Sequence, residues 1–256
     1  MTEHEVIING IKVNARYSDQ AVNEIFLPLL KRWTKLQAKK GIRLLVMLAA
    51  PPGAGKSTLL SFLEKLSRSV PGLCPVQAIG MDGFHRRQED LLRHTAVREG
   101  KTVSLVEIKG APVTFELDRL AESIRLAASG AVCSWPKYDR LLHNPVENAL
   151  TVNGDIVLLE GNYLLLDEEG WRDLSRFADD TVFLRAPEAM LRSRLIERRI
   201  RTGVEMEAAV RFVDFSDMPN VQLCLTKTMP AEIQLGIDET GEYHWEKGNL
   251  LGQGSV

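Results

Sequence analysis

Residues 50–58, which read APPGAGKST, decide the fold of this chain. They follow an apolar run at residues 42–49 that has the length of a buried strand. They precede residues 59–66, which are apolar at helical spacing. A strand, a glycine-rich turn and a helix in this order are the context of a phosphate-binding loop, or P-loop. The backbone N–H groups of such a loop and the N-terminus of its helix attract an anion.

The side chains of this loop predict how it would hold a nucleotide. Lys56 can reach the β- and γ-phosphates, and the hydroxyl of Ser57 can ligate Mg²⁺. Ala50 stands at the first position of the motif, where glycine is usual, and alanine is tolerable there if its φ is negative. We expect the nucleotide to contact Pro52, Gly53, Ala54, Gly55, Lys56, Ser57 and Thr58.

The composition is that of a soluble protein with one large domain. The chain has 256 residues, of which 45% are hydrophobic and 26% charged, and its net charge is −2. The near-zero charge argues against a nucleic acid or an acidic membrane as partner. The three cysteines lack metal-ligand spacing, the first residues lack the pattern of a signal peptide, and no apolar run could span a bilayer. We expect a cytoplasmic protein.

Strands and helices alternate along the chain on both sides of the loop. Residues 155–161 have the continuous apolar pattern of a central parallel strand. Residues 75–80, 131–135 and 181–185 are shorter strand candidates, with amphipathic helices between them. The sequence therefore predicts an α/β protein with the P-loop fold, a doubly wound parallel sheet with helices on both faces.

The organisation that we expect is a single domain in three parts. Residues 1–41 form an N-terminal arm, as a hairpin or an irregular segment, followed by a helix. Residues 42–235 form the core, and residues 236–256 form a C-terminal hairpin and tail. Within the core, we predict short helices at residues 86–106, a loop at 136–143, and a helix end with a turn at 212–220.

Two carboxylates stand where predicted strands end, which is where ligands bind in open α/β sheets. Asp82 comes just after the strand at residues 75–80, and Glu160 closes the strand at residues 155–161. Asp82 could act in chemistry or cap a turn. Glu160 could hold Mg²⁺ or form a structural salt bridge.

A helix that begins at Pro187 is rich in arginine. Arg194, Arg198 and Arg201 are spaced i, i+4 and i+7, so they share one face. Such a run is often only a solvated surface. Beside a P-loop it could instead neutralise the charge of a transferring phosphoryl group. From the residues alone, a solvated face and a lid are equally open.

The motifs together resemble those of the small-metabolite P-loop kinases, the family of uridine kinase, phosphoribulokinase and type I pantothenate kinase. A guanine-reading Asn-Lys-x-Asp motif and a transporter Leu-Ser-Gly-Gly motif are both absent from the sequence. Within the family, the chain looks most like the bacterial branch of fructose-transport-system or fructokinase-like kinases. Five features in the family's order carry the resemblance: the P-loop, MDGFH at 81–85, KGAP at 109–112 followed by Phe115, Tyr138-Asp139 with His143, and LLEG at 158–161.

The resemblance implies an ATP- and Mg²⁺-dependent phosphotransferase whose acceptor is an alcohol group of a small metabolite. Asp82 matches the aspartate that accepts the proton of the acceptor hydroxyl. The arginine-rich helix matches the family's lid, which closes over ATP, so the resemblance implies a helical lid at about residues 190–206. The remaining roles follow in the same way: Lys56, Arg194 and Arg198 in catalysis, Ser57 and Glu160 at the metal, and Asp82, His85, Lys109, Tyr138, Arg140 and His143 at the acceptor.

The identity of the acceptor stays open at the level of sequence. Arg140 replaces the phenylalanine that follows Tyr-Asp in the family, which argues against a nucleobase and favours an anionic or polyhydroxyl group. A sugar or sugar-like polyol is the first choice, with pantothenate or a nucleoside as alternatives. A non-catalytic nucleotide-binding regulator is the alternative from another class. Asp217 and Asn220 lie where the family often lines the adenine end, and a homodimer is a possible assembly.

Overall fold

The computed structural model describes residues 1–8, 11–98, 100–140 and 142–247. A six-stranded sheet with the order β12-β11-β10-β3-β9-β4 lies at its centre, and all of its strand pairs are parallel except β11 with β12. The α/β fold with a mostly parallel sheet is therefore as predicted. The strands are β3 Leu44–Ala49, β4 Val76–Gly80, β9 Ile156–Gly161, β10 Asp180–Arg185, β11 Ile233–Ile237 and β12 Tyr243–Lys247.

Strand β3 is apolar throughout because both faces of the sheet are covered. All six of its residues are buried. Side chains alternate across a strand, so Val46 belongs to one hydrophobic cluster and Met47 to the cluster on the other face. The expectation of a buried strand leading into the glycine-rich loop is confirmed.

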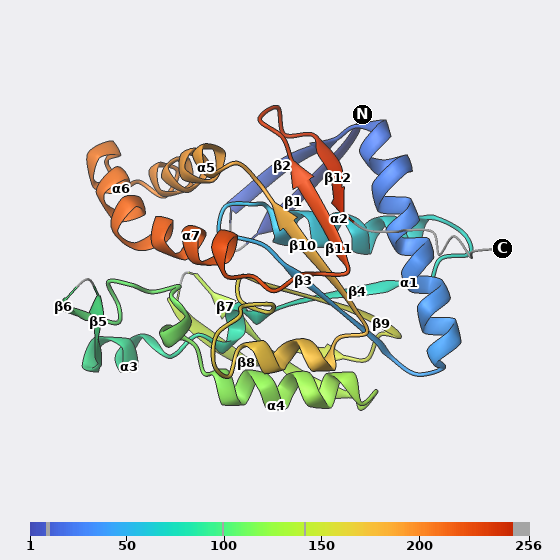
Figure 1. Ribbon diagram of the computed structural model, residues 1–256, viewed down its shortest axis with the longest axis horizontal. Helices are drawn as coiled ribbons and strands as arrows, with labels where there is room; N and C mark the ends of the chain where they lie inside the picture. Colours follow the sequence, from blue (N-terminus) through green and yellow to red (C-terminus); the bar gives the residue numbers. More distant parts are fainter. Residues whose placement is uncertain (9–10, 99, 141, 248–256) are drawn as a thin grey trace.

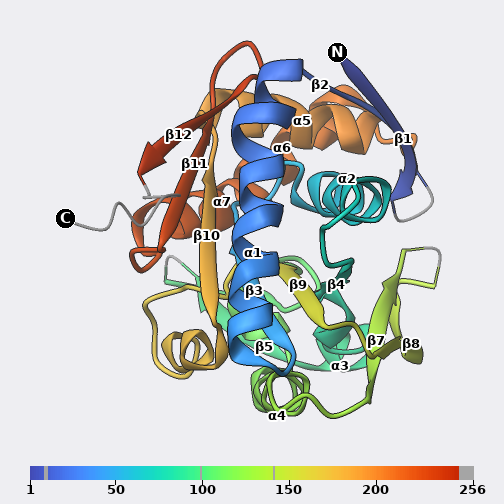
Figure 2. The same cartoon turned by 90° about the vertical axis from the view of Figure 1, so that its right-hand side faces the viewer.

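Helices cover the two faces of this sheet, as Figures 1 and 2 show. Helices α1 and α2 pack in the first cluster, and helix α4 packs in the second. The helices are α1 Leu27–Lys40, α2 Lys56–Ser69, α3 Gln88–Arg93, α4 Leu117–Ala128, α5 Glu188–Ile200, α6 Met206–Phe212 and α7 Met218–Thr226. None of the helices in the described residues is long and apolar enough to cross a membrane.

Two π-helical segments precede prolines, which cannot donate a backbone hydrogen bond to the preceding turn. The segment Ala21–Phe26 leads into α1, which has Pro28 in its first turn. The segment Val213–Asp217 joins α6 to α7, which has Pro219 in its first turn. Residues 212–220 are therefore helical, and the predicted helix end and turn there is wrong.

Three antiparallel hairpins of the described residues stand outside the central sheet, and two of them were not predicted. Of the strand predicted at residues 131–135, only residues 133–135 are strand; they continue through residue 139 and pair with a second strand rather than with the central sheet, so part of the loop predicted at 136–143 is strand. Residues 86–106 hold one helix and a small hairpin rather than helices alone. The hairpins are β1 Thr2–Ile8 with β2 Ile11–Tyr17, β5 Thr95–Arg98 with β6 Lys101–Ser104, and β7 Cys133–Asp139 with β8 Asn144–Val152.

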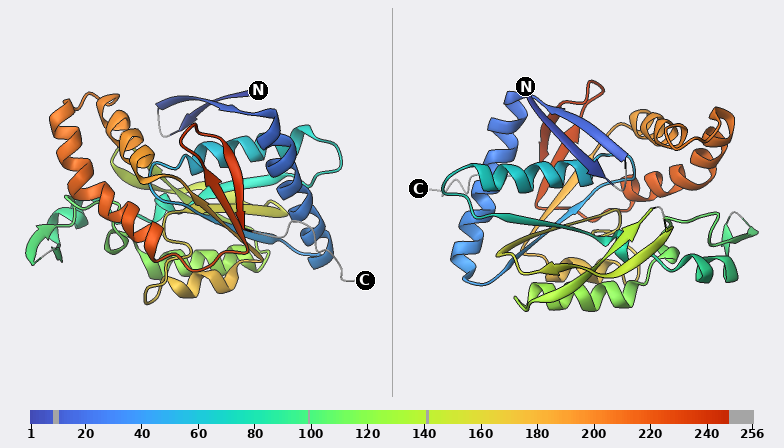
Figure 3. Two further views of the ribbon diagram at one scale, coloured as in Figure 1. Left: turned by 45° about the horizontal axis from the view of Figure 1, so that its top comes forward. Right: turned by 180° about the vertical axis from the view of Figure 1, so that it is seen from behind.

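The two ends of the described chain meet on one side of the molecule. The N-terminal hairpin β1–β2 lies over α2, and β11–β12 lies beside it (Figure 3). The side chain of Trp245 donates a hydrogen bond from Nε1 to the carbonyl of Glu24 at 3.2 Å. The boundary that we placed between residues 235 and 236 falls inside β11, so the C-terminal hairpin continues the central sheet.

Candidate active site

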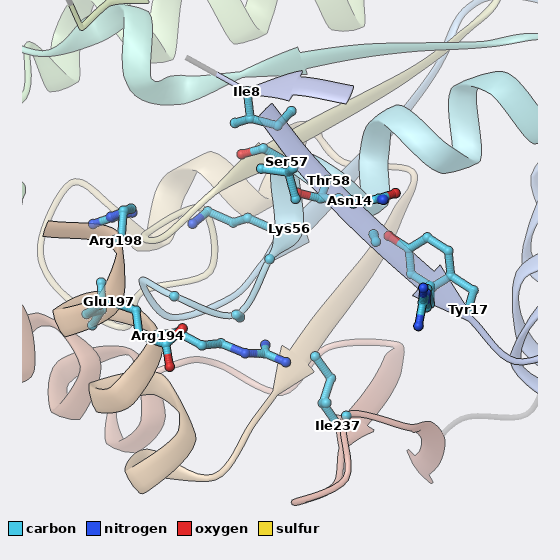
Figure 4. A pocket seen from close by; sticks show the side chains of 18 of the residues that line it. Ile8, Asn14, Tyr17, Lys56, Ser57, Thr58, Arg194, Glu197, Arg198 and Ile237 are labelled. Carbon is cyan, nitrogen blue, oxygen red and sulfur yellow. The ribbon is translucent and has the colours of Figure 1, made fainter. Parts of the chain in front are cut away.

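A cavity of about 650 Å³ opens at the carboxyl ends of the parallel strands, above the P-loop (Figure 4). Residues 53–58 of the loop line it, together with side chains of the lid helix α5. Pro52, which we also expected to contact the nucleotide, is buried and does not line the cavity. A cavity of this size is typical of small-molecule sites.

The backbone of the loop has the conformation that a phosphate cradle needs. Gly53 and Gly55 have φ of +84° and +87°, which glycine adopts without a steric penalty. Ala50 is not among the described residues with positive φ, so alanine costs nothing at that position. A side chain at Gly53 would press on the lid helix, 3.1 Å from the carbonyl oxygen of Leu191. Glycine therefore also lets the lid pack directly on the loop.

Ser57, Lys56 and Glu160 form a compact group at the start of α2. The hydroxyl of Ser57 donates a 2.5 Å hydrogen bond to Glu160, and the Lys56 ammonium lies 3.9 Å from the same carboxylate. Burial raises the pKa of Glu160, and the charge of Asp82 adds to this effect although Lys56 opposes it. Oxygen ligands of this kind suit Mg²⁺, and a divalent cation would offset the cost of two neighbouring carboxylates. The residues present therefore fit the metal.

Asp82 lies in a single 3₁₀ turn, Met81–Phe84, directly after β4. Its neighbour Gly83 is required there, because a Cβ would lie 2.2 Å from the carbonyl oxygen of Pro136 in β7. The indole of Trp135 donates a 2.8 Å hydrogen bond to the carbonyl of Gly80. The hairpin β7–β8 thus packs against the residues on both sides of Asp82 and holds the turn that carries this side chain.

The electrostatic surroundings keep Asp82 ionised. Burial alone would raise its pKa, but nearby cations outweigh burial and hold the pKa below its usual range. The positive charge of His85 has the largest effect, followed by those of Lys56, Arg140 and Arg198. Burial lowers the pKa of His85 itself, and the neighbouring Asp82 opposes this shift. Asp82 is therefore a carboxylate at neutral pH, able to accept a hydrogen bond.

The arginines of the lid divide into two groups. Three are paired with carboxylates: Arg192 with Asp214 at 2.7 Å, Arg199 with Asp217 at 3.1 Å and Arg201 with Glu197 at 3.7 Å. Arg194 and Arg198 form no ion pair with any other residue that the structure describes, and both line the cavity. Their free positive charge makes them the lid arginines that an incoming anion would meet first.

The residues expected at the acceptor form a cluster next to Asp82. The Lys109 ammonium donates hydrogen bonds to Gln88 at 2.8 Å and to the carbonyl of His143 at 3.0 Å. It also lies 5.0 Å from the ring centroid of Tyr138, which is 5.2 Å from the ring of His85. The His143 side chain is exposed, so its carbonyl contributes to the cluster rather than its imidazole. Arg140 lines the main cavity.

Two residues expected at the adenine end do not line the cavity, and the sequence did not predict one wall of the cavity. Asp217 and Asn220 are buried, and neither lines the cavity. The wall that the sequence did not reveal comes from both hairpins at the chain ends, with Asn14 and Tyr17 from β2 and Tyr243 from β12. Each of these residues is distant from the P-loop in sequence, so no motif connects them to it.

A P-loop beneath an arginine-bearing lid, with a carboxylate at the adjoining strand end, defines a P-loop kinase. No family model matches the chain. It is 31% identical over 185 residues to a Schizosaccharomyces pombe protein described as a "putative uridine kinase", covering 70% of this chain and 77% of that one. It is 40% identical over 242 residues to the uncharacterized protein YggC of Escherichia coli K12, covering 94% of this chain and 98% of YggC.

A solved structure gives the same result. The crystal structure of a "putative fructose transport system kinase" from Silicibacter sp. TM1040 is 29% identical and superimposes with a TM-score of 0.69, covering 82% of this chain and 97% of that one. The chain belongs to the family of P-loop kinases that includes uridine kinase, phosphoribulokinase and pantothenate kinase. It is an ATP-dependent small-molecule kinase, and the alternative of a non-catalytic regulator is thereby set aside.

Proposed function

We propose that this kinase transfers the γ-phosphoryl group of ATP to an alcohol of a small polyhydroxylated metabolite, a sugar or a sugar-like polyol. The observation that carries the proposal is the position of Asp82, an ionised carboxylate among the cations Lys56, Arg140 and Arg198 at one end of the cavity. This is the arrangement that phosphoryl transfer needs, with one group to aim the hydroxyl and several to neutralise the phosphates.

In the proposed reaction, Asp82 accepts a hydrogen bond from the acceptor hydroxyl and aims its oxygen at the γ-phosphorus. A bond forms between that oxygen and phosphorus while the bond from phosphorus to the β,γ-bridging oxygen breaks. ADP leaves with the electron pair of the broken bond, and the hydroxyl proton passes to Asp82. Lys56, Arg194 and Arg198 stabilise the negative charge on the phosphoryl oxygens and on the leaving group.

Ser57 and Glu160 are the residues that would hold Mg²⁺ in this proposal. The ion, when bound, neutralises charge on the β- and γ-phosphates. The hydrogen bond between them supports this assignment, because it brings a hydroxyl and a carboxylate oxygen together at the start of α2. The carboxylate of Glu160 also lies 3.9 Å from the ammonium of Lys56, the side chain that we propose to contact the phosphates.

The acceptor cluster supports an acceptor that carries hydroxyls together with a negative charge. The charge of Arg140 helps to lower the pKa of Lys109, and both cations act on Tyr138. Such a pair suits a carboxylate or a phosphate. This observation keeps pantothenate, which has an alcohol and a carboxylate, as the second candidate. A Shouchella clausii pantothenate kinase is 25% identical over 206 residues.

The test is a coupled assay of ADP release with a panel of acceptors. Neutral sugars, sugar acids, sugar phosphates, pantothenate and uridine are each added to the protein with ATP and Mg²⁺. We expect one polyhydroxylated acceptor to raise ADP release at least about tenfold over the rate without acceptor. Stimulation by uridine alone would contradict the proposed acceptor class, and stimulation by pantothenate alone would favour the second candidate.

The acceptor step should also depend on pH through Lys109. Burial and the neighbouring Arg140 lower the pKa of Lys109 to about 8. Below this pH the side chain is a cation, and above it the charge is lost, so kcat/KM for the acceptor should fall as the pH rises above about 8. In Lys109→Arg the charge persists at higher pH, and the fall should disappear. A decline of the same size in Lys109→Arg would assign the pH dependence to another group, and kcat/KM for ATP over the same range is the control.

A further inference from the structure

The lining of the cavity includes the P-loop, Asp82 and Arg140 and also both hairpins at the chain ends, and these parts differ in character. One end holds Asp82 and Arg140, where the proposed transfer takes place. The other end is formed by the two hairpins, where the rings of Tyr17 and Tyr243 lie 5.9 Å apart between centroids. Figure 4 shows the side chain of Lys56 pointing away from Tyr17. If the γ-phosphate lies at Asp82, the nucleoside end of ATP must extend toward the hairpins.

The N-terminal hairpin is fixed to the same helix that begins at the P-loop. The ring of Tyr17 stacks on Phe62 of α2, with centroids 4.3 Å apart and an angle of 28° between the planes. Nε2 of His4 lies 3.1 Å from the hydroxyl of Ser61, and the His4 side chain is buried. These contacts hold β2 at a fixed distance from the first turn of α2, where the phosphates would bind.

The wall that the hairpins form has the chemistry of a site for a flat ring. The partly buried side chains of Val13 and Ala15 on β2 line the cavity on one side. Ile237 and Tyr243 line it on the other side. Arg16, Thr240 and Glu242 of the same hairpins add polar groups to this lining. Apolar side chains beside a small number of polar groups are typical of pockets that bind an aromatic ligand. The exposed amide of Asn14, which both donates and accepts hydrogen bonds, supplies such a group.

We propose that strand β2 of the N-terminal hairpin and the hairpin β11–β12 enclose the nucleoside of ATP, so that residues 13–17 are part of the nucleotide site. The inference rests on the proposed function, because it takes the P-loop as the triphosphate site. It assigns to the N-terminal arm a contact with substrate in addition to its packing on α2. It also predicts that the hairpin discriminates between a nucleotide and a bare chain of phosphates.

The test compares two ligands that share a triphosphate and differ in the nucleoside. Binding of the ATP analogue AMP-PNP and of inorganic tripolyphosphate, each with Mg²⁺, is measured by calorimetry on the full chain. In Ala15→Leu, which enlarges a side chain on the β2 wall, we expect the Kd for AMP-PNP to rise about tenfold. The Kd for tripolyphosphate should change less than about twofold, which also shows that the variant is folded.

The double variant Val13→Ala/Asn14→Ala removes wall contacts instead of adding bulk and should weaken AMP-PNP selectively as well. The matched control is Lys12→Ala, an exposed position of β2 that does not line the cavity and pairs with Glu5 on the hairpin. If the wall variants weaken both ligands equally or neither of them, the inference is wrong while the P-loop site stands. If wild type binds neither ligand, the proposed P-loop site fails, and the inference fails with it.

Discussion

Replacing Asp82 with asparagine should nearly abolish phosphoryl transfer while leaving nucleotide binding intact. The amide is similar in shape and still accepts a hydrogen bond, but it cannot take the proton of the acceptor hydroxyl. General base contributions of this kind are worth about 10²–10⁴-fold in rate. We expect kcat for ADP release with acceptor to fall by that factor, with Kd for AMP-PNP changed less than about threefold, because in our proposal Asp82 contacts the acceptor rather than the nucleotide.

The matched control for this experiment is Asp118→Asn, which removes an exposed carboxylate from helix α4. Its kcat should equal that of wild type. ADP release is also measured without acceptor, which gives the rate of ATP hydrolysis alone. Only the acceptor-dependent rate requires a base for the acceptor hydroxyl, so only that rate should fall. If Asp82→Asn retains acceptor-dependent turnover within a few-fold of wild type, the proposed role of Asp82 is wrong.

The parts of this site that the sequence predicted are those in which chemistry follows directly from a local pattern. The apolar run at residues 42–49 and the helical spacing after Lys56 can be recognised in one short window, and both elements are present. Asp82 and Glu160 could be placed because Asp82 follows an apolar strand and Glu160 lies at the end of another, and parallel strands of one sheet end at the same edge. Local periodicity and parallel topology were sufficient in these cases.

The parts that were missed depend on contacts between distant segments or on polar patterns. Strand β8 is exposed along most of its length and β7 is only partly buried, so their residues do not form the apolar run that marks a central strand. At Pro219 the usual rule that proline ends a helix failed, because a π-helical segment precedes it. The wall of the cavity near Tyr17 and Tyr243 joins residues more than 200 positions apart, and no spacing rule connects them.

The pairing of the lid arginines is also invisible in the sequence, although it separates candidates that look alike. Five arginines lie on or beside α5, and helical spacing placed Arg194, Arg198 and Arg201 on one face. In the structure, Arg201 has a carboxylate partner one turn away, whereas Arg194 and Arg198 have none among the described residues. The ion pairs therefore narrow the candidate catalytic arginines of the lid to Arg194 and Arg198.

Of these two, Arg198 should have the larger effect on the rate. Burial and the neighbouring Arg140 lower its pKa, yet a guanidinium keeps its charge at neutral pH. Arg198 and Arg140 repel each other, and Asp82 is a carboxylate close to both of them. An anion that binds between the two arginines would relieve this repulsion. The charge on the phosphoryl group is redistributed in the transition state, and an arginine at that position is worth about 10³–10⁵-fold in related phosphoryl transfers.

Arg198→Ala should therefore lower kcat by about 10³-fold, while Arg198→Lys should recover part of the loss, because it restores the charge without the two-pronged geometry of a guanidinium. The control is Arg192→Ala, since Arg192 is on the same helix but pairs with Asp214 at the surface. Steady-state kinetics then distinguish two roles. A fall in kcat with little change in KM for ATP means that Arg198 acts on the transition state. A rise in KM alone would mean that it only binds the nucleotide, and the proposed catalytic role would be wrong.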